Sequence, residues 1–288
     1  MQQEVFSITI GDYMHVSKSS ASNIIKKVSS ALALLALSYI MMPRNENEVS
    51  FKRIQFYNKA SLPRVIGSLD CTHIKIQSPG KDNAELFRNQ KGYFSINVQT
   101  VSSTDLKIMD LVARWPGSTH DQTIFDHSNL KRRLENGEFG NSLLVADSGY
   151  VNTQHIITPL LTPGNEVEQL YNESVTRTKN PVERQYGVSK RRFTVLALGL
   201  RLKLETAQTV IVAVGVLHNI AIDKREQEPP LDQEVNLANI NPKMISELNL
   251  QCFSKTCPSM FFRYLKHFGM HFKNIKYNKN IISSKNMT

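Results

Sequence analysis

Apolar residues in the first 45 positions recur at the three- and four-residue spacing of amphipathic helices. The clearest series follows the helix-capping residue Ser17 and comprises Ile24, Ile25, Val28 and Leu32. A shorter helix is expected over residues 7–16. Two helices joined by a tight turn predict a helix-turn-helix region over residues 1–45, with a linker over residues 46–63.

After this linker the pattern changes to the alternation that is typical of strands. We expect strands over residues 65–76, 94–102 and 106–113, a helix over about 119–134, and an apolar strand over 142–146. This order predicts that the first three strands form a meander and that the fourth returns parallel to the first.

The last part of the predicted domain is helical. Residues 151–179 contain Pro159, Pro163 and Gly164 and are expected to be irregular. Helices are expected over about 181–198 and 206–223. Residues 64–223 therefore predict one α/β domain, a mixed sheet flanked by helices and preceded by the small helical region. Residues 224–288 are expected to form a polar, basic and loosely ordered tail.

Composition narrows the class of protein. With 41% hydrophobic and 21% charged residues among 288, the chain is expected to bury a globular core. Its net charge of +10 favours a polyanionic partner. Three cysteines, an odd number, do not suggest a disulfide framework and favour a reducing compartment. No run of 18 apolar residues is present, so no membrane association is expected.

Four acidic residues lie in distinctive local sequences. They are Asp70 in Gly-Ser-Leu-Asp-Cys-Thr-His, Asp121 in Trp-Pro-Gly-Ser-Thr-His-Asp, Asp147 in Leu-Leu-Val-Ala-Asp-Ser-Gly-Tyr, and Glu183 in Asn-Pro-Val-Glu-Arg. If the first and fourth strands are adjacent and parallel, Asp70 and Asp147 converge at one edge of the sheet. Phosphodiester cleavage by a two-metal mechanism needs oxygen ligands, such as carboxylates, that hold two divalent ions about 3.5–4 Å apart.

Each acid also has a structural interpretation. Asp121 and Glu183 both fit capping boxes at helix starts, the second with Pro181 at the first helical position. Asp147 before Ser-Gly-Tyr could form a turn. Asp70 is harder to explain structurally, because an acid within an apolar strand is costly unless something binds it.

The motifs taken as a series resemble those of Harbinger-type transposases, above all the domesticated Harbinger-derived nucleases of animals. The series adds Gly-Tyr-Phe-Ser-Ile-Asn-Val-Gln from residue 92 and Leu-His-Asn-Ile from residue 217. The resemblance covers about residues 64–222 and implies a ribonuclease-H-like fold. It implies that Asp70, Asp147 and Glu183 are the catalytic triad and that all four acids, with Asp121 as auxiliary, bind Mg²⁺ or Mn²⁺.

Several other residues are candidates for supporting roles. Helix-turn-helix geometry favours DNA contact by Lys18, Ser19, Ser22 and Asn23, against the alternative of a packing arm. Phosphate contact is expected from Lys190, Arg191 and Arg192, against the alternative of a solvated helix face. His73 and His120 lie near two acids and could contact phosphate or be structural. In the tail, Cys252, Cys257, His267 and His271 suggest a zinc finger, but with a short spacer.

The leading hypothesis is a divalent-metal-dependent DNA nuclease that hydrolyses phosphodiester bonds by a two-metal mechanism. The alternative is a domesticated transposase that binds DNA or a partner protein without cleaving. The resemblance further implies a separate Myb-like protein partner and a nuclear location, with the cytoplasm as a second compartment.

Overall fold

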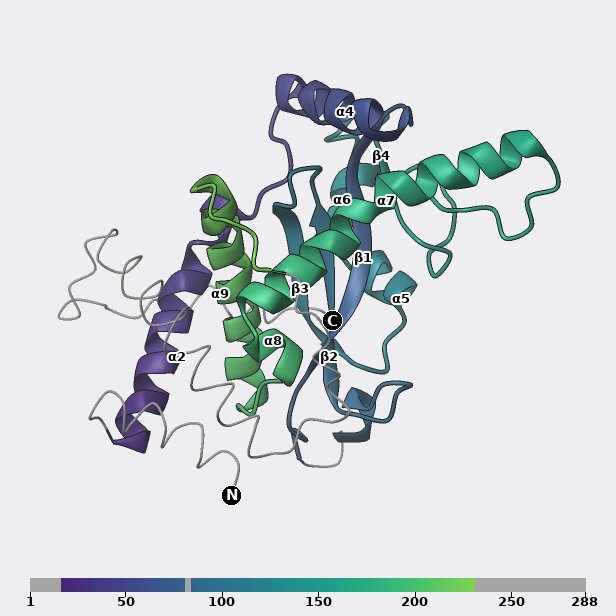
Figure 1. Ribbon diagram of the computed structural model, residues 1–288. Helices are drawn as coiled ribbons and strands as arrows, with labels where there is room; N and C mark the ends of the chain where they lie inside the picture. Colours follow the sequence, from purple (N-terminus) through teal and green to yellow (C-terminus); the bar gives the residue numbers. More distant parts are fainter. Residues whose placement is uncertain (1–16, 81–83, 231–288) are drawn as a thin grey trace. The chain divides into compact units, whose positions relative to one another are not determined.

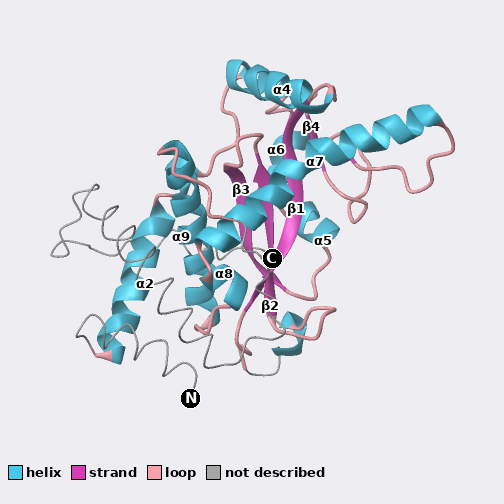
Figure 2. Cartoon of the chain, viewed as in Figure 1, coloured by secondary structure: helices cyan, strands magenta, loops and turns pink. Residues whose placement is uncertain are grey.

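A five-stranded mixed sheet with helices on both faces forms the centre of the described part of the chain (Figures 1 and 2). The computed structural model describes residues 17–80 and 84–230, and the structural statements below concern these residues. They all fall within one compact unit, residues 1–235. The α/β architecture, a mixed sheet flanked by helices with helices before it, is the predicted fold class and is consistent with a ribonuclease-H-like fold.

The strand order confirms the predicted topology. Strands β1 (Val65–Lys75), β2 (Ser95–Ser102) and β3 (Ile108–Pro116) form an antiparallel meander. Strand β4 (Leu143–Val145) then pairs in parallel with β1, and the short β5 (Ile156–Ile157), which the sequence did not predict, pairs in parallel with β4. The sheet order is β3-β2-β1-β4-β5. The parallel pairing of β1 with β4 is what positions the candidate site.

Helices lie on both faces of the sheet, and the long α7 (Glu166–Arg192) and α9 (Leu204–Asp223) share one of them. The short α8 (Val195–Leu198) lies on the same side, as Figure 1 shows. On the other side, the helix expected over 119–134 is divided into α5 (Asp121–Asp126) and α6 (Asn129–Glu135). The division arises because Ser128 accepts a hydrogen bond from the Lys131 N–H and starts a new helix.

Helix α9 forms the apolar centre of its layer. Its length and apolar composition would allow it to cross a membrane, but 67% of that apolar window is buried inside the protein. Among the described residues it is the only helix that meets those criteria. Burial of this kind is expected for the core helix of a globular domain.

The N-terminal helices pack onto this same layer. Helix α2 (Lys18–Leu34) lies alongside α9 in Figure 1, and the short α3 (Ala36–Tyr39) follows it. The Asn219 side-chain amide of α9 donates to the carbonyls of Tyr39 and Ile108. This packing matches the alternative of a packing arm. The first helix of the expected helix-turn-helix, residues 7–16, lies outside the described residues.

Residues 46–63, expected as a linker, instead contain a packed helix. Helix α4 (Glu46–Ala60) is capped by Asn45, whose side chain accepts from the Glu48 N–H. Its apolar residues Val49 and Phe56 are buried in the core. The linker interpretation was wrong because Val49 and Phe56 anchor this helix in the core, although most of its other residues are polar.

Helix α7 begins fifteen residues before the predicted start at 181. Asn165 caps it by accepting from the Glu168 N–H, and Pro181 lies inside the helix rather than at its start. Proline costs a helix one backbone hydrogen bond, but Val175, Val182 and Val188 are fully buried and hold both halves on the sheet.

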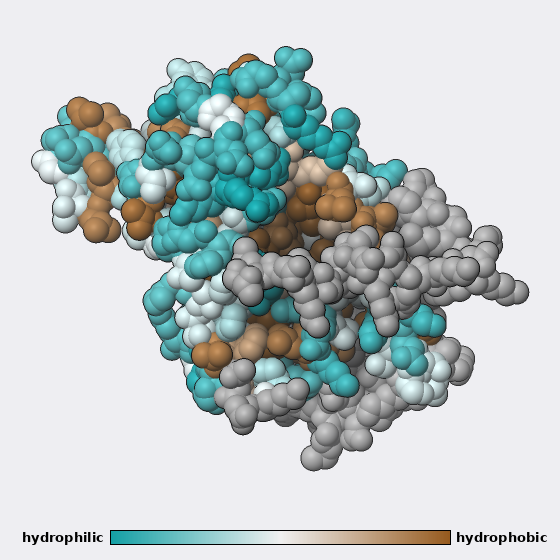
Figure 3. Space-filling model, turned by 180° about the vertical axis from the view of Figure 1, so that it is seen from behind, coloured by the Kyte–Doolittle hydropathy of each residue, from teal (hydrophilic) through white to brown (hydrophobic). Residues whose placement is uncertain are grey.

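The amino-terminal end of α7 and the loop before it project from the sheet (Figure 1). Three apolar side chains there are well exposed: Leu161 at 84%, Val167 at 75% and Leu170 at 57%. Figure 3 shows the resulting apolar colouring at that end of the molecule. These exposed residues precede Glu183 by more than three helical turns and do not belong to the site described below.

Candidate active site

Three of the four predicted acids converge around a single lysine. Asp70 lies within β1, and Asp147 follows the end of the parallel neighbour β4 by two residues. Glu183 comes from α7, which crosses above them. The Lys179 ammonium lies within ion-pair distance of one oxygen of each carboxylate: Asp70 Oδ2 at 3.4 Å, Asp147 Oδ2 at 3.3 Å and Glu183 Oε1 at 3.2 Å.

The backbone orients two of these carboxylates. The Cys71 N–H donates to Asp70 Oδ1 at 2.8 Å, and the Gly149 N–H donates to Asp147 Oδ1 at 2.9 Å. Asp147 therefore forms the turn suggested as its structural role and also turns its second oxygen into the cluster. The Glu183 side chain, at 57% exposed, extends from the mid-portion of α7, so its interpretation as a helix-capping residue was wrong.

The cluster perturbs the protonation of its members. Burial, assisted by the nearby charge of Asp147, raises the pKa of Asp70 to about 6, although Lys179 opposes the shift. Burial alone would lower the pKa of Lys179, but Asp70, Asp147 and Glu183 outweigh it and raise that pKa above its usual value. Lys179 therefore remains a cation at neutral pH.

The donor set fits a hard divalent cation. Carboxylate oxygens are the ligands that Mg²⁺ and Mn²⁺ prefer, and three of them already surround one positive charge. Within residues 17–80 and 84–230, no group of three or more Asp, Glu, His or Cys side chains is already arranged as a metal site. Asp70, Asp147 and Glu183 would have to draw closer to hold a metal ion.

The structure does not join Asp121 to the other three acids through any contact in the described part of the chain. Asp121 is the first residue of α5, whose preceding residue, His120, makes no side-chain cap. The Asn97 side-chain amide donates to Asp121 Oδ1 at 2.8 Å and to the Thr119 carbonyl at 2.9 Å. The expected capping box is therefore not formed, and a buried amide holds Asp121 instead.

Asp70 and Asp121 lie on opposite sides of the sheet. Asp70 faces α7, whereas its neighbour Cys71 points to the α5 side of the sheet. There Cys71 Sγ lies 3.3 Å from Tyr150 Oη, which also accepts from Gln99 Nε2 at 3.2 Å. Burial, followed by the charge of Asp121, raises the pKa of the Cys71 thiol, so it remains protonated.

Sequence reasoning missed two residues that organise the site. One is Lys179; its spacing of four residues before Glu183 would have revealed it had the helix been predicted to start earlier. The other is Tyr186, whose hydroxyl donates to the Asp70 carbonyl at 2.7 Å and accepts from Thr100 Oγ1 at 2.9 Å. Tyr186 thereby ties α7 to β1 at the residue that carries the first acid.

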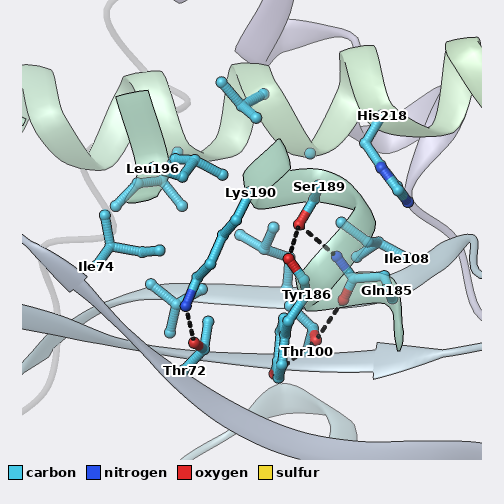
Figure 4. A pocket seen from close by; sticks show the side chains of 15 residues that line it. Thr72, Ile74, Thr100, Ile108, Gln185, Tyr186, Ser189, Lys190, Leu196 and His218 are labelled. Carbon is cyan, nitrogen blue, oxygen red and sulfur yellow. Dashed lines mark hydrogen bonds between the residues drawn. The ribbon is translucent and has the colours of Figure 1, made fainter. Parts of the chain in front are cut away.

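Figure 4 shows the polar contacts beneath this part of α7. Gln185 Oε1 accepts from Thr100 Oγ1 at 3.3 Å, and Gln185 Nε2 donates to Ser189 Oγ at 3.2 Å. Lys190 Nζ donates to Thr72 Oγ1 at 2.7 Å. Thr72 follows Asp70 by two residues and shares its face of β1, so the Lys190 ammonium lies on the same side of the sheet as the acids.

The other residues predicted to contact DNA are placed differently. Arg192 is only 6% exposed, and its guanidinium donates to the carbonyls of Glu226 and Gln227. Arg192 therefore offers no open phosphate contact, because its side chain is buried and bonded to backbone carbonyls, and this corrects its predicted role. Arg191 is half-buried. In α2, Ser19, Ser22 and Asn23 are exposed near the start of the helix, which begins at Lys18.

The two candidate histidines occupy the α5 side or its rim. His73 Nδ1 lies 3.1 Å from Ser95 Oγ, and burial lowers the pKa of this histidine. His120 is exposed. The possible zinc ligands of the tail lie outside the described residues.

Comparison with known proteins identifies a family. Residues 69–219, just over half of the chain, match the family described as DDE superfamily endonuclease. The chain is 31% identical over 221 residues to "Putative nuclease HARBI1" of Mus musculus and 30% identical to that of Bos taurus, covering 76% of this chain and 63% of each relative. It is 22% identical to "Protein ALP1-like" of Arabidopsis thaliana, covering 78% of this chain and 59% of that protein.

The chain thus spans less than two thirds of the length of these relatives. No solved structure matches it. The matched interval begins within β1 and ends within α9, so it contains all four acids and Lys179.

Proposed function

Because the chain belongs to the DDE superfamily of endonucleases, with Harbinger-derived nucleases among its relatives, we propose that it is a divalent-metal-dependent DNA nuclease. Its catalytic acids would be Asp70, Asp147 and Glu183. The observation that carries this proposal is the convergence of these carboxylates, from two parallel strands and a helix, on one cationic position.

The chain's own residues suit phosphodiester hydrolysis. When bound, Mg²⁺ or Mn²⁺ would supply activation of a water nucleophile and stabilisation of the leaving oxygen. Asp70, Asp147 and Glu183 would hold the metal, with Asp70 and Asp147 oriented by backbone N–H groups. Asp121 would be an auxiliary group on the α5 side of the sheet, held by the Asn97 amide.

Basic residues would position the DNA. The Lys190 side chain is half-buried on the same side of the sheet as the acids, and its ammonium bonds to a neutral hydroxyl, so it can contact a phosphate without first breaking an ion pair. The net charge of +10 supports a polyanionic substrate. DNA contact by α2, a Myb-like protein partner and a nuclear location belong to this proposal as well.

The test is nicking of supercoiled duplex DNA by the purified chain with Mg²⁺ or Mn²⁺. Asp147→Asn and Glu183→Gln should each lose cleavage while remaining folded. Glu173→Gln is the matched control, because Glu173 lies on the same helix, is exposed and pairs only at the surface with Arg177. Retained cleavage in Asp147→Asn would contradict the assigned roles.

A second candidate function is DNA or partner binding without cleavage. The observation that favours it is that the Lys179 ammonium already neutralises part of the charge that a metal would bind. Salt-dependent binding of duplex DNA by a chain that nicks nothing with either metal would support this candidate.

A further inference from the structure

The centre of the acid cluster is occupied by a side chain of the protein itself. Lys179 is the only basic residue in the described part of the chain that forms ion pairs with Asp70, Asp147 or Glu183. Its side chain is 13% exposed, as is that of Asp70. Lys179 therefore fills the space between the three carboxylates rather than resting on their surface.

The position of Lys179 follows from the backbone. Lys179 and Glu183 are four residues apart on α7, so their side chains share one face of the helix. Around them, Thr178 and Val182 are fully buried, and Tyr186 ties the next turn to the Asp70 carbonyl. The helix is thus anchored on both sides, while the lysine can move by rotating its own four-carbon stem.

A metal ion and this ammonium cannot share the same position. The ammonium lies 3.2–3.4 Å from its three oxygens, whereas Mg²⁺ binds oxygen at about 2.0–2.1 Å. A divalent ion held by the same carboxylates would lie within a few ångströms of Lys179 Nζ, and the two cations would repel one another strongly.

We propose that Lys179 is a built-in competitor for the metal: its ammonium holds the three acids together without metal and must leave their centre when metal binds. The inference rests on the proposed function for the identity of the metal-binding acids. It adds that the metal affinity of the site is lowered by this lysine. A displaced Lys179 remains next to the acids and is then available to a DNA phosphate.

The test measures metal binding, not activity. Mn²⁺ alone is titrated into the full chain by calorimetry, for wild type, Lys179→Met and Lys179→Gln. Both variants should bind Mn²⁺ at least about tenfold more tightly than wild type, because no ammonium has to be displaced. Arg177→Met is the control, since Arg177 lies on the same helix, is 71% exposed and pairs with Glu173. Its Mn²⁺ affinity should equal that of wild type.

Melting temperature supplies a second measurement. Without metal, Lys179→Gln should melt below wild type, because three carboxylates lose their shared counter-charge. With saturating Mn²⁺ the difference should shrink or reverse. Should Lys179→Met fail to fold, Lys179→Gln carries the same two comparisons with a smaller change in polarity.

The outcomes separate the inference from the proposed function. Mn²⁺ binding that is lost in Asp147→Asn but unchanged or weaker in both Lys179 variants overturns the inference and leaves the nuclease site standing. No Mn²⁺ binding by wild type or by either Lys179 variant overturns both. Tighter binding in the Lys179 variants that is again lost in the double variant with Asp147→Asn supports both.

Discussion

Adjacent residues of strand β1 have charged partners on one face of the sheet and uncharged partners on the other. Asp70 faces α7 and shares one ammonium with two other carboxylates, whereas Cys71 faces α5 and joins a network of uncharged groups. Asp121 borders this second network and is held by the neutral amide of Asn97. Three of the four acids therefore lie on the α7 side of the sheet, and Asp121 lies on the α5 side.

The difference lies in how each face balances its charge. Three carboxylates and one ammonium on the α7 side leave an excess of negative charge, which a divalent cation can satisfy. On the α5 side, the Asp121 carboxylate accepts a hydrogen bond from the neutral Asn97 amide. The charge on the α7 side is thus left unbalanced, whereas the Asp121 carboxylate on the α5 side is bonded to a neutral amide.

The largest expected effect is on DNA nicking, which should depend more strongly on Asp70 than on Asp121. Asp70→Asn should lower kcat/KM for DNA nicking by about 100-fold or more, about 2.7 kcal/mol of transition-state stabilisation. Asp121→Asn should lower it by less than about tenfold, because an amide can replace its contacts. Both are measured under the same metal conditions. Equal losses would place Asp121 among the essential ligands and remove the distinction.

The second prediction concerns pH and the metal-free protein. The pKa of Asp70 is about 6, against an ordinary value of 3.8, so the folded chain binds this proton more tightly than the unfolded chain. Through this carboxyl alone, the free energy of unfolding should fall by about 3 kcal/mol as the pH rises through this interval.

Urea unfolding at a series of pH values between about 4 and 7 measures this slope. Asp70→Asn should remove the Asp70 share of this fall and leave the share of the buried Asp110, whose pKa burial also raises to about 6. An unchanged slope in Asp70→Asn would show that Asp70 is not the group responsible.

The third prediction compares two buried tyrosines, one for each face. Tyr186→Phe and Tyr150→Phe should each lower the free energy of unfolding by about 1–2 kcal/mol, since each hydroxyl makes two contacts. Only Tyr186→Phe should also weaken Mn²⁺ binding, because Tyr186 fixes the strand at Asp70. Calorimetric titration of both variants checks this, and weakened binding in Tyr150→Phe would contradict it.

The smallest expected effect concerns DNA affinity. Lys190→Met should weaken binding of duplex DNA a few-fold and lower the slope of log K against log salt concentration by about 0.9, as for one lost phosphate contact. Arg192→Met should leave that slope unchanged and lower stability instead, because its guanidinium bonds to backbone carbonyls. A salt slope unaltered by Lys190→Met would remove Lys190 from the DNA interface.

Much of the fold could be predicted from periodicity. Alternation in residues 65–113 and the apolar run before Asp147 indicated a meander and a returning parallel strand, and both are present. The start of α7 was placed too late, because Asn180-Pro-Val-Glu183 has the local features of a helix start as well as Asn165-Glu-Val-Glu168, where the helix begins. Burial of Val175 and Thr178 against the sheet decided that the helix begins earlier.

The same limit applies to the linker interpretation of residues 46–63. Most residues of α4 are polar, so its helical period is weak in the sequence. Phe56 becomes fully buried only when it meets Val65, Leu143 and Val145 in the folded protein. The contacts that stabilise this helix come from residues that are distant along the chain, and periodicity does not record them.

The sequence by itself determined the fold class, the family resemblance and the pair Asp70 and Asp147, because strand period and parallel pairing follow from local pattern. Only the tertiary structure decided that Lys179 lies at the centre of the acids, that Asp121 lies across the strand from Asp70, and that Arg192 is buried. The physical reason is that charge balance and burial depend on which side chains meet in space, and α7 brings its residues to the sheet only after folding.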